Sequence, residues 1–310
     1  MKRITLCASL ILLVSVSSTH AQVLLKQVPR ENSHVETRIQ SNVKQTLNIG
    51  GMDVVTAADT QMVMSVTTRQ RDAEGRVPAD SKVKSMQVTT EVQGQVYNFD
   101  SANPDEKGTS PLEFLRDLHK LAVEQTTTTV YGKDDRVVEV KIDKSVGDKL
   151  PEQAKGLVGD LFDSDQLKFK SNQELDRLPG QVVKTGDSWT RMEVWAFGSG
   201  QTMTFEVQYT YAGTAEHKKQ SVDRITARTL SAVFKIDDQS PLPLRVKSSE
   251  LKAVGTTELL FDRTHKTVVA TESTVQVTGD LTFTVNGQEL PAKLDLKMTG
   301  TSETAPVKVQ

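Results

Sequence analysis

The chain has 310 residues, of which 38 are basic and 40 acidic, so its formal net charge at neutral pH is −2. A charge this close to balance gives no electrostatic basis for binding nucleic acid or an anionic membrane surface. Cys7 is the only cysteine, which excludes a disulfide framework, and the chain is long enough to bury a core without one.

The first 21 residues have the pattern of a secretory signal peptide. Lys2 and Arg3 precede an apolar run from Leu6 to Val16, which is shorter than the roughly 20 residues of a membrane-spanning helix. Small residues end the segment at Ala21, so we expect cleavage there and a cysteine-free mature chain that begins at Gln22. No later segment is long and apolar enough to span a membrane. The sequence therefore predicts an exported protein, periplasmic or secreted, with no transmembrane segment after cleavage.

Two neighbouring segments with opposite alternation predict a long hairpin near the start of the mature chain. Apolar residues occupy odd positions from Val35 to Ile49 and even positions from Met52 to Val66. The switch falls at Gly50-Gly51, where glycine permits a tight turn. This register pairs Ile49 with Met52 and Ile39 with Met62, which brings all the apolar side chains to one face.

The next segment, 82–100, again has strand character, and a helix is predicted after it. Ser110 is suited to cap the helix and Pro111 to occupy its first turn. Leucines then recur at helical spacing from Leu112 to Leu121.

The centre of the chain mixes strand and helix patterns. The segment 124–144 predicts two strands that turn near Gly132, and 151–162 predicts a second helix in spite of two internal glycines. The segment 167–177 shows no clear periodicity and receives no prediction.

The C-terminal part returns to strands, and its clearest unit is a hairpin at Asn286-Gly287. This dipeptide favours a type I′ turn, which pairs Phe283 with Leu290 and Val277 with Leu296. Strands of this length with one apolar face tend to curl. We therefore predict a mainly β fold in which long antiparallel strands form a half-barrel or barrel-like sheet, with a few short central helices on its concave side. The mature chain is expected to form a single β-rich domain over 22–310, or two β halves, 22–105 and 178–300, that flank a helix-containing segment, 106–177.

Aromatic residues are concentrated between Trp189 and Tyr211, where alternation predicts a further hairpin turning at Gly198-Ser199-Gly200. Pairing Phe197 with Met203 would place Trp195 opposite Phe205 and Trp189 opposite Tyr211. The resulting face is either core or the wall of a pocket. Its candidate ligand-binding residues are Trp189, Arg191, Glu193, Trp195, Phe197, Phe205, Tyr209 and Tyr211.

Two charged residues, Arg191 and Glu193, share this aromatic face. Buried charges are costly unless they are paired and hydrogen-bonded. They are therefore expected either to pair with each other at the rim of the sheet or to form the polar floor of a wet cavity. If the face is exposed instead, it is expected to be a surface for a protein partner.

No pattern of catalytic or metal-binding residues is present. His34, His119, His217 and His265 have no metal-ligand spacing, and His119 is expected at the surface or the boundary of the core. The acids from Asp163 to Glu174 lack the middle ligand and the glycine of a calcium loop. We accordingly predict no cofactor, no metal and no enzymatic activity.

Two short motifs support a resemblance. The segments Leu178–Trp189 (LPGQVVKTGDSW) and Gly255–Gly279 (GTTELLFDRTHKTVVATESTVQVTG), together with the signal peptide, resemble an uncharacterised family of exported, β-rich bacterial proteins with "P…vGdsW" and "G…FD" segments. The chain departs from the family at Arg263-Thr264-His265, where a glycine is usual. The resemblance implies export and a β fold; the expected architecture is also similar to that of periplasmic half-barrel lipoprotein carriers.

Three hypotheses about function follow from these observations. The first is a non-enzymatic protein of the cell envelope that binds an apolar or amphipathic ligand, such as a lipid, in its curled sheet. The second is a structural or protein-interaction module whose partner is another envelope protein; an enzyme is the least favoured alternative. Nucleic acid is not expected as a partner in any of them.

Overall fold

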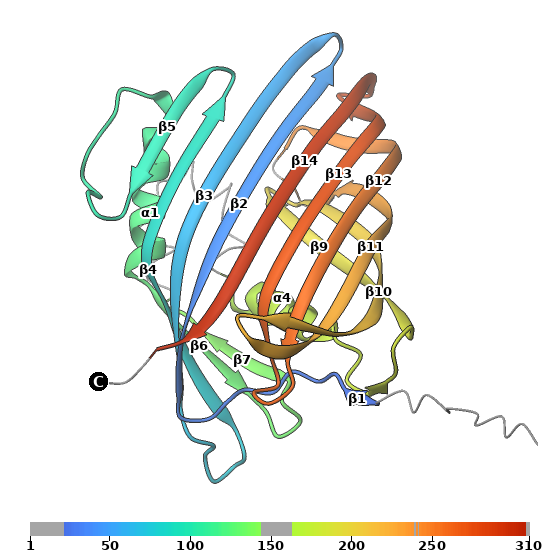
Figure 1. Ribbon diagram of the computed structural model, residues 1–310. Coiled ribbons are helices and arrows are strands. Elements are labelled where there is room, and N and C mark those ends of the chain that lie inside the picture. The colour runs from blue at the N-terminus through green and yellow to red at the C-terminus, as the bar shows by residue number, and fades with distance from the viewer. Residues whose placement is uncertain (1–21, 144–162, 239, 241, 308–310) are drawn as a thin grey trace, which may run out of the picture.

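The computed structural model describes residues 22–143, 163–238, 240 and 242–307. One antiparallel sheet of 12 strands dominates it, with the order β7-β6-β4-β3-β2-β14-β13-β12-β11-β10-β9 and with β5 paired to β4. The sheet is strongly curved and its two end strands, β7 and β9, are not paired with each other (Figure 1). The predicted mainly β fold with few helices is confirmed.

The strands are long and joined mostly by short turns. The N-terminal strands of the sheet are β2 (Ser33–Ile49), β3 (Met52–Thr68), β4 (Val77–Val92), β5 (Gln95–Asp100), β6 (Thr126–Tyr131) and β7 (Val137–Lys141). The C-terminal strands are β9 (Ser188–Gly198), β10 (Gln201–His217), β11 (Gln220–Ile236), β12 (Leu244–Asp262), β13 (Thr267–Val285) and β14 (Gln288–Pro306). A separate small sheet pairs β1 (Val23–Leu24) with β8 (Val182–Val183).

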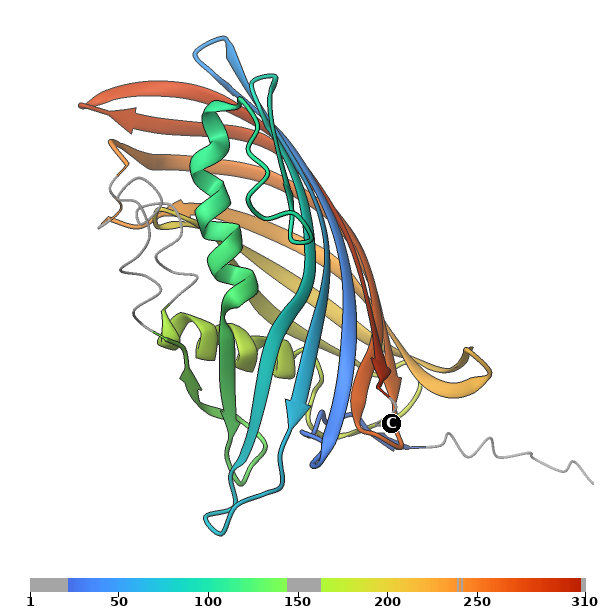
Figure 2. The same cartoon turned by 90° about the vertical axis from the view of Figure 1, so that its left-hand side faces the viewer.

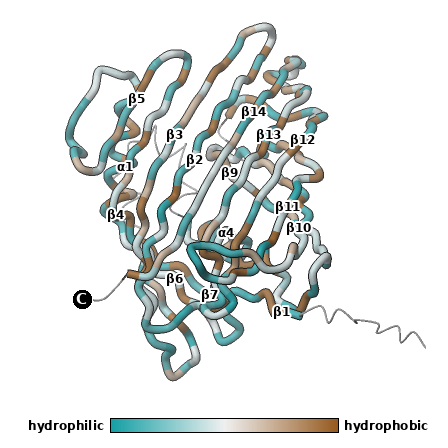
Figure 3. The backbone as a smooth tube through the Cα atoms, viewed as in Figure 1, coloured by the Kyte–Doolittle hydropathy of each residue, from teal (hydrophilic) through white to brown (hydrophobic). Residues whose placement is uncertain are grey.

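The two hairpins predicted from turn residues and alternation have the predicted register. Ile49 pairs with Met52 and Ile39 with Met62, while Phe283 pairs with Leu290. β2 and β14 are neighbours in the sheet, so the two hairpins lie side by side at its centre. Apolar and polar residues alternate along these strands (Figure 3), which gives the sheet one apolar face.

In the described part of the chain, two α-helices lie on the concave side of the sheet (Figure 2). A 3-10 turn, η1 (Pro111–Phe114), leads into α1 (Leu115–Glu124), and the Ser110 hydroxyl accepts a hydrogen bond from the Leu112 amide at 3.3 Å, as the predicted cap requires. The second predicted helix, 151–162, lies outside the described residues.

The segment that received no prediction forms α4 (Ser164–Asp176). The Asp163 carboxylate caps it by accepting hydrogen bonds from the amides of Asp165 and Gln166 at 2.9 and 2.8 Å. This helix has no apolar stripe because its polar side chains bond to the sheet, as described below.

The apolar core is divided into two clusters. The larger one lies between the C-terminal strands and is closed at one end by Val23, Leu25, Leu178 and Val183. The smaller one consists of Met86, Val88, Tyr97 and Phe99, with α1 packed against it. Apolar concave side chains of β2 and β3 between the two clusters are only half-buried and belong to neither; they include Ile39, Ala58 and Met64.

His119 of α1 is half-buried beside the smaller cluster, at the boundary of the core. Its ring stacks on Tyr97 and Phe99, with ring centroids 5.6 and 5.2 Å away, and its Nδ1 lies 3.0 Å from the Tyr97 hydroxyl. Burial lowers the pKa of His119 from 6.5 to about 4.

This pKa predicts a loss of stability in mild acid. Between pH 6.5 and 4 the unfolded chain binds a proton at His119 that the folded chain does not, so the free energy of unfolding falls as the pH falls. The expected loss is about 3 kcal/mol, at about 1.4 kcal/mol per pH unit. His119→Phe keeps the stacked ring and removes the titration. Urea unfolding at pH 7 and pH 4.5 should therefore show a smaller loss in the variant; equal losses would contradict the assignment.

Candidate ligand-binding site

The aromatic hairpin forms as β9 and β10, but the predicted pairing was wrong by two residues. Met203 pairs with Trp195 and Tyr209 with Trp189. The physical reason is a tight turn at Ser199-Gly200, where both φ angles are positive (52° and 73°), together with a bulge just before it that leaves Phe197 unpaired. Because a shift of two residues preserves alternation, the predicted face is still a single face.

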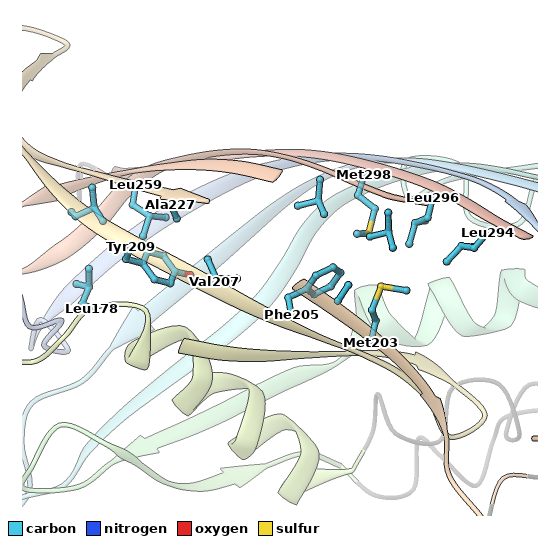
Figure 4. Packing of buried hydrophobic residues seen from close by; sticks show 14 of the residues in the cluster. Leu178, Met203, Phe205, Val207, Tyr209, Ala227, Leu259, Leu294, Leu296 and Met298 are labelled. Carbon is cyan, nitrogen blue, oxygen red and sulfur yellow. The ribbon is translucent and has the colours of Figure 1, made fainter. Parts of the chain in front are cut away.

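Part of this face is core. Phe205, Tyr209 and Tyr211 are buried, and Figure 4 shows Met203 and Phe205 on β10 across the interior from Leu296 and Met298 on β14. Trp189 stacks on Tyr209 with ring centroids 5.9 Å apart. Its indole N–H donates a hydrogen bond to the Arg177 carbonyl at 2.8 Å.

The remainder of the face borders empty space. Trp195 packs edge-on against Phe205, with centroids 5.3 Å apart, and lines a cleft between α4 and the hairpin. Phe197, the bulged residue, has 41% of its surface exposed and lines the same cleft. The candidate residues are therefore divided between core and pocket wall.

The two charged candidates do not pair with each other, so the expected rim pairing was wrong. Glu193 is 4% exposed, accepts a hydrogen bond from the Tyr209 hydroxyl, and lies 3.2 Å from Nη2 of Arg177. Arg191 donates from Nε to the Asp176 carbonyl at 2.7 Å. Both side chains thus bind the C-terminal end of α4 rather than each other.

The buried group formed by Arg177, Glu193 and Tyr209 has a defined charge state. Burial, reinforced by the neighbouring Glu193 carboxylate, raises the pKa of Tyr209, which therefore stays a neutral donor. Burial alone would lower the pKa of Arg177, but the carboxylates of Glu174 and Glu193 outweigh it and raise that pKa. Nη1 and Nη2 of the Arg177 guanidinium thus bind the two carboxylates beneath α4, and the phenol of Tyr209 donates to one of them, while Nε of Arg177 is buried without a partner.

The last candidate residue, Tyr211, belongs to a separate buried group near β1. Its hydroxyl donates to the Asp223 carboxylate at 2.7 Å, and Arg263 binds the same carboxylate through Nε and Nη2 at 3.0 and 2.6 Å. Burial raises the pKa of Tyr211 to about 12. The adjacent Asp262 accepts hydrogen bonds from the amides of Thr264 and His265, which stabilises the turn where the resembling family usually has glycine.

Two adjacent amide side chains of α4 connect the opposite ends of the sheet. Asn172 accepts from the Val137 amide at 3.0 Å and donates to the Val137 carbonyl at 2.9 Å, on β7. Gln173 accepts from the Val194 amide at 2.7 Å and donates to the Val194 carbonyl at 3.1 Å, on β9. Each amide takes the place of a peptide group of a neighbouring strand. Through these contacts at Val137 and Val194, α4 therefore bridges the gap between the two end strands of the open sheet.

The described residues line at least three volumes on or within the concave side. The α4 cleft measures about 350 Å³ and includes Leu167, Phe169, Lys170, Trp195 and Phe197 in its lining. An apolar cavity of about 100 Å³ lies deeper, with a lining that includes Phe197, Met203, Phe234 and Phe283. A third, of about 50 Å³, adjoins Glu193, Trp195 and Phe205, and its lining includes the hydroxyl side chains of Tyr209, Thr229, Thr257, Thr271 and Ser273. Phe197 lines both the cleft and the apolar cavity, so these two volumes are neighbours.

A larger concavity, of about 430 Å³, lies beside β5 and the loop that follows it. Its lining is mainly polar and includes Asp59, Gln87, Asn98 and Lys107. Its chemistry does not suit an apolar ligand, so the α4 cleft and the apolar cavity form the candidate site in spite of their smaller size.

Across the part of the chain that the structure describes, no three or more His, Cys, Asp or Glu side chains are grouped to hold a metal ion. Among the same residues, no helix has both the length and the apolar character needed to cross a membrane.

No protein-family model matches the chain, and no curated protein sequence matches it. Among solved structures it is similar to lipovitellin, from a study of lipid–protein interactions, with a TM-score of 0.43 and 9% identity over 91% of this chain; it spans 26% of the lipovitellin chain. It is also similar to the monoaromatic hydrocarbon channel CymD, with a TM-score of 0.25, 6% identity and 89% of each chain covered. A DUF1329 family protein from Desulfovibrio piger gives a TM-score of 0.13 and 7% identity, over 86% of this chain and 84% of that one. These values carry no argument about function, and the family resemblance of the motifs stays a prediction.

Proposed function

We propose that this chain is an exported, non-enzymatic binding protein of the cell envelope, which holds an apolar or amphipathic ligand between α4 and the curled sheet. The observation that carries the proposal is the α4 cleft with the apolar cavity next to it. The cleft's volume of about 350 Å³ falls within the range of about 300–1,000 Å³ that is typical of small-molecule sites. Its wall is aromatic on both sides, with Trp195 and Phe197 from the hairpin and Phe169 from the helix.

The division of the core supports the same function. The apolar side chains of a packed interior are mostly fully buried. Here Ile39, Ala58 and Met64 stay half-buried between the two clusters, and Phe169 is largely exposed. An apolar ligand would remove such surface from water, at about 25 cal/mol for each Å² buried.

The alternative function, a protein-interaction module, would require free strand edges and an exposed aromatic face. Peptide groups of both end strands are already bonded to α4, at Val137 and Val194, and much of the aromatic face is buried. The observation that favours this alternative lies on the convex side, where Val254 is 73% exposed and Leu230 is also exposed.

A titration of the protein purified after export separates the two functions. Trp195 and Trp189 are the only tryptophans. Saturated fatty acids or phospholipids that enter the α4 cleft should shift the tryptophan emission to the blue in a saturable manner. Trp195→Ala should weaken binding at least about five-fold, because an aromatic contact contributes about 1 kcal/mol beyond its buried area. Val254→Ala, on the convex side, is the control and should bind like the wild type. A flat response to the whole panel would overturn the proposal and leave the interaction module as the better account.

A further inference from the structure

The α4 cleft has a charge at its edge as well as an aromatic wall. The charged residues in its lining are Lys170, Glu174 and Arg177. Glu174 pairs with Nη1 of Arg177 at 2.6 Å, and Arg177 also binds the buried Glu193. No acidic side chain of the described residues forms an ion pair with Lys170, which is exposed. Among the described residues, Lys170 is therefore the one cation in the cleft lining without an acidic partner, and it lies beside an apolar wall.

We propose that the ligand of the α4 cleft is a single-chain amphiphile with an anionic headgroup, and that Lys170 binds this headgroup. This inference rests on the proposed function and specifies its ligand class. A carboxylate or phosphate at the edge would gain a charge-assisted hydrogen bond from the Lys170 ammonium while its chain lies against Phe169, Trp195 and Phe197. A neutral amphiphile would gain only the apolar contacts.

Two further polar groups of the cleft lining, Gln173 and Glu174, are already engaged within the protein. The amide of Gln173 is already used on both sides by Val194, so it is not free to bind a headgroup. The Glu174 carboxylate, the one acid in the cleft lining, is engaged by Arg177. A cationic headgroup would therefore meet the Lys170 ammonium, and the described part of the cleft lining holds no carboxylate without a partner to offset it.

The position of Phe197 gives the chain of the ligand a direction. Phe197 lines both the cleft and the apolar cavity, so a chain that is anchored at Lys170 and runs past Phe197 points away from water. The bulge that leaves Phe197 unpaired in the ladder is what places its ring at this junction.

The test compares dodecanoate with 1-dodecanol, which have chains of the same length and differ in the charge of the headgroup. The wild-type protein should bind dodecanoate about five-fold more tightly, the ratio expected for an exposed ion pair worth about 1 kcal/mol. The preference should shrink in 0.5 M salt, because the pair is exposed to solvent. Affinities are measured by calorimetry and by tryptophan emission.

Lys170→Gln should abolish the preference while leaving the affinity for 1-dodecanol within about two-fold of the wild type. Lys168→Gln is the matched control, since Lys168 lies on the same helix but outside the cleft lining, and it should keep the preference. If both ligands bind and the wild type shows no preference, or Lys170→Gln retains it, the anionic headgroup is overturned and the binding function stands. If neither ligand binds, the proposed function fails and the inference fails with it.

Discussion

Gly279→Ala is expected to destabilise the protein by about 4 kcal/mol or to prevent it from folding, a cost at the upper end for a single substitution. Gly279 lies within β13 with φ at 151°, and a Cβ atom there would be 2.1 Å from the carbonyl oxygen of Glu250 and 2.9 Å from the Cα of Leu251. Both contacts are backbone atoms of β12, so no side-chain rotation can relieve them. The ladder between β12 and β13 would have to separate at this point.

Gly300→Ala is the matched control on the next strand, β14. Its nearest neighbours would be a side-chain atom, Ser273 Oγ, at 3.3 Å and the Gln40 carbonyl oxygen at 3.7 Å, and its φ is not in the left-handed region. Its cost should stay below about 1 kcal/mol. Urea unfolding monitored by circular dichroism measures both; equal costs would show that β12 and β13 are not packed this closely at Gly279.

The parts of the fold that could be predicted are those in which two local signals agree. At Gly50-Gly51 and Asn286-Gly287, a turn dipeptide and a change in alternation indicate the same register, and the strands pair accordingly. At Ser199-Gly200 the alternation is preserved by any shift of two residues, so it could not distinguish the predicted pairing from the observed one. The bulge at Phe197 is what sets the observed register, and no residue type in this segment marks the position of a bulge.

Helix α4 could not be predicted for a related reason. Amphipathic helices are recognised by an apolar stripe, whereas α4 contributes polar side chains to the sheet edges. The residues that bond α4 to the sheet are the adjacent amides Asn172 and Gln173. This pair could be recognised only if the two end strands, β7 and β9, were already known to lie on either side of the helix. The candidate site depends on this helix, so the sequence indicated one wall of the cleft and not the other.

The assignment of Arg191 and Glu193 shows the same limit. Because burying a charge is costly, Arg191 and Glu193 were each correctly expected to have a partner. In the sequence, the nearest residue of opposite charge on the same face was the other of these two. Their actual partners, Arg177, Tyr209 and the Asp176 carbonyl, come mainly from the end of α4. Export and cleavage after Ala21 stay predictions, since residues 1–21 lie outside the described part of the chain.

Glu193→Leu is expected to destabilise the protein by about 3 kcal/mol, because it leaves Nη2 of Arg177 and the hydroxyl of Tyr209 buried without their acceptor. Adding Tyr209→Phe removes one of these orphaned donors, so the double variant should be about 1 kcal/mol more stable than the sum of the two single losses. Urea unfolding of the four proteins in this cycle measures the coupling. Because both oxygens of Glu193 are used by protein groups, the folded Glu193→Leu variant should bind the uncharged 1-dodecanol within about two-fold of the wild type. A loss of binding without a loss of stability would instead make Glu193 the polar floor of the ligand site.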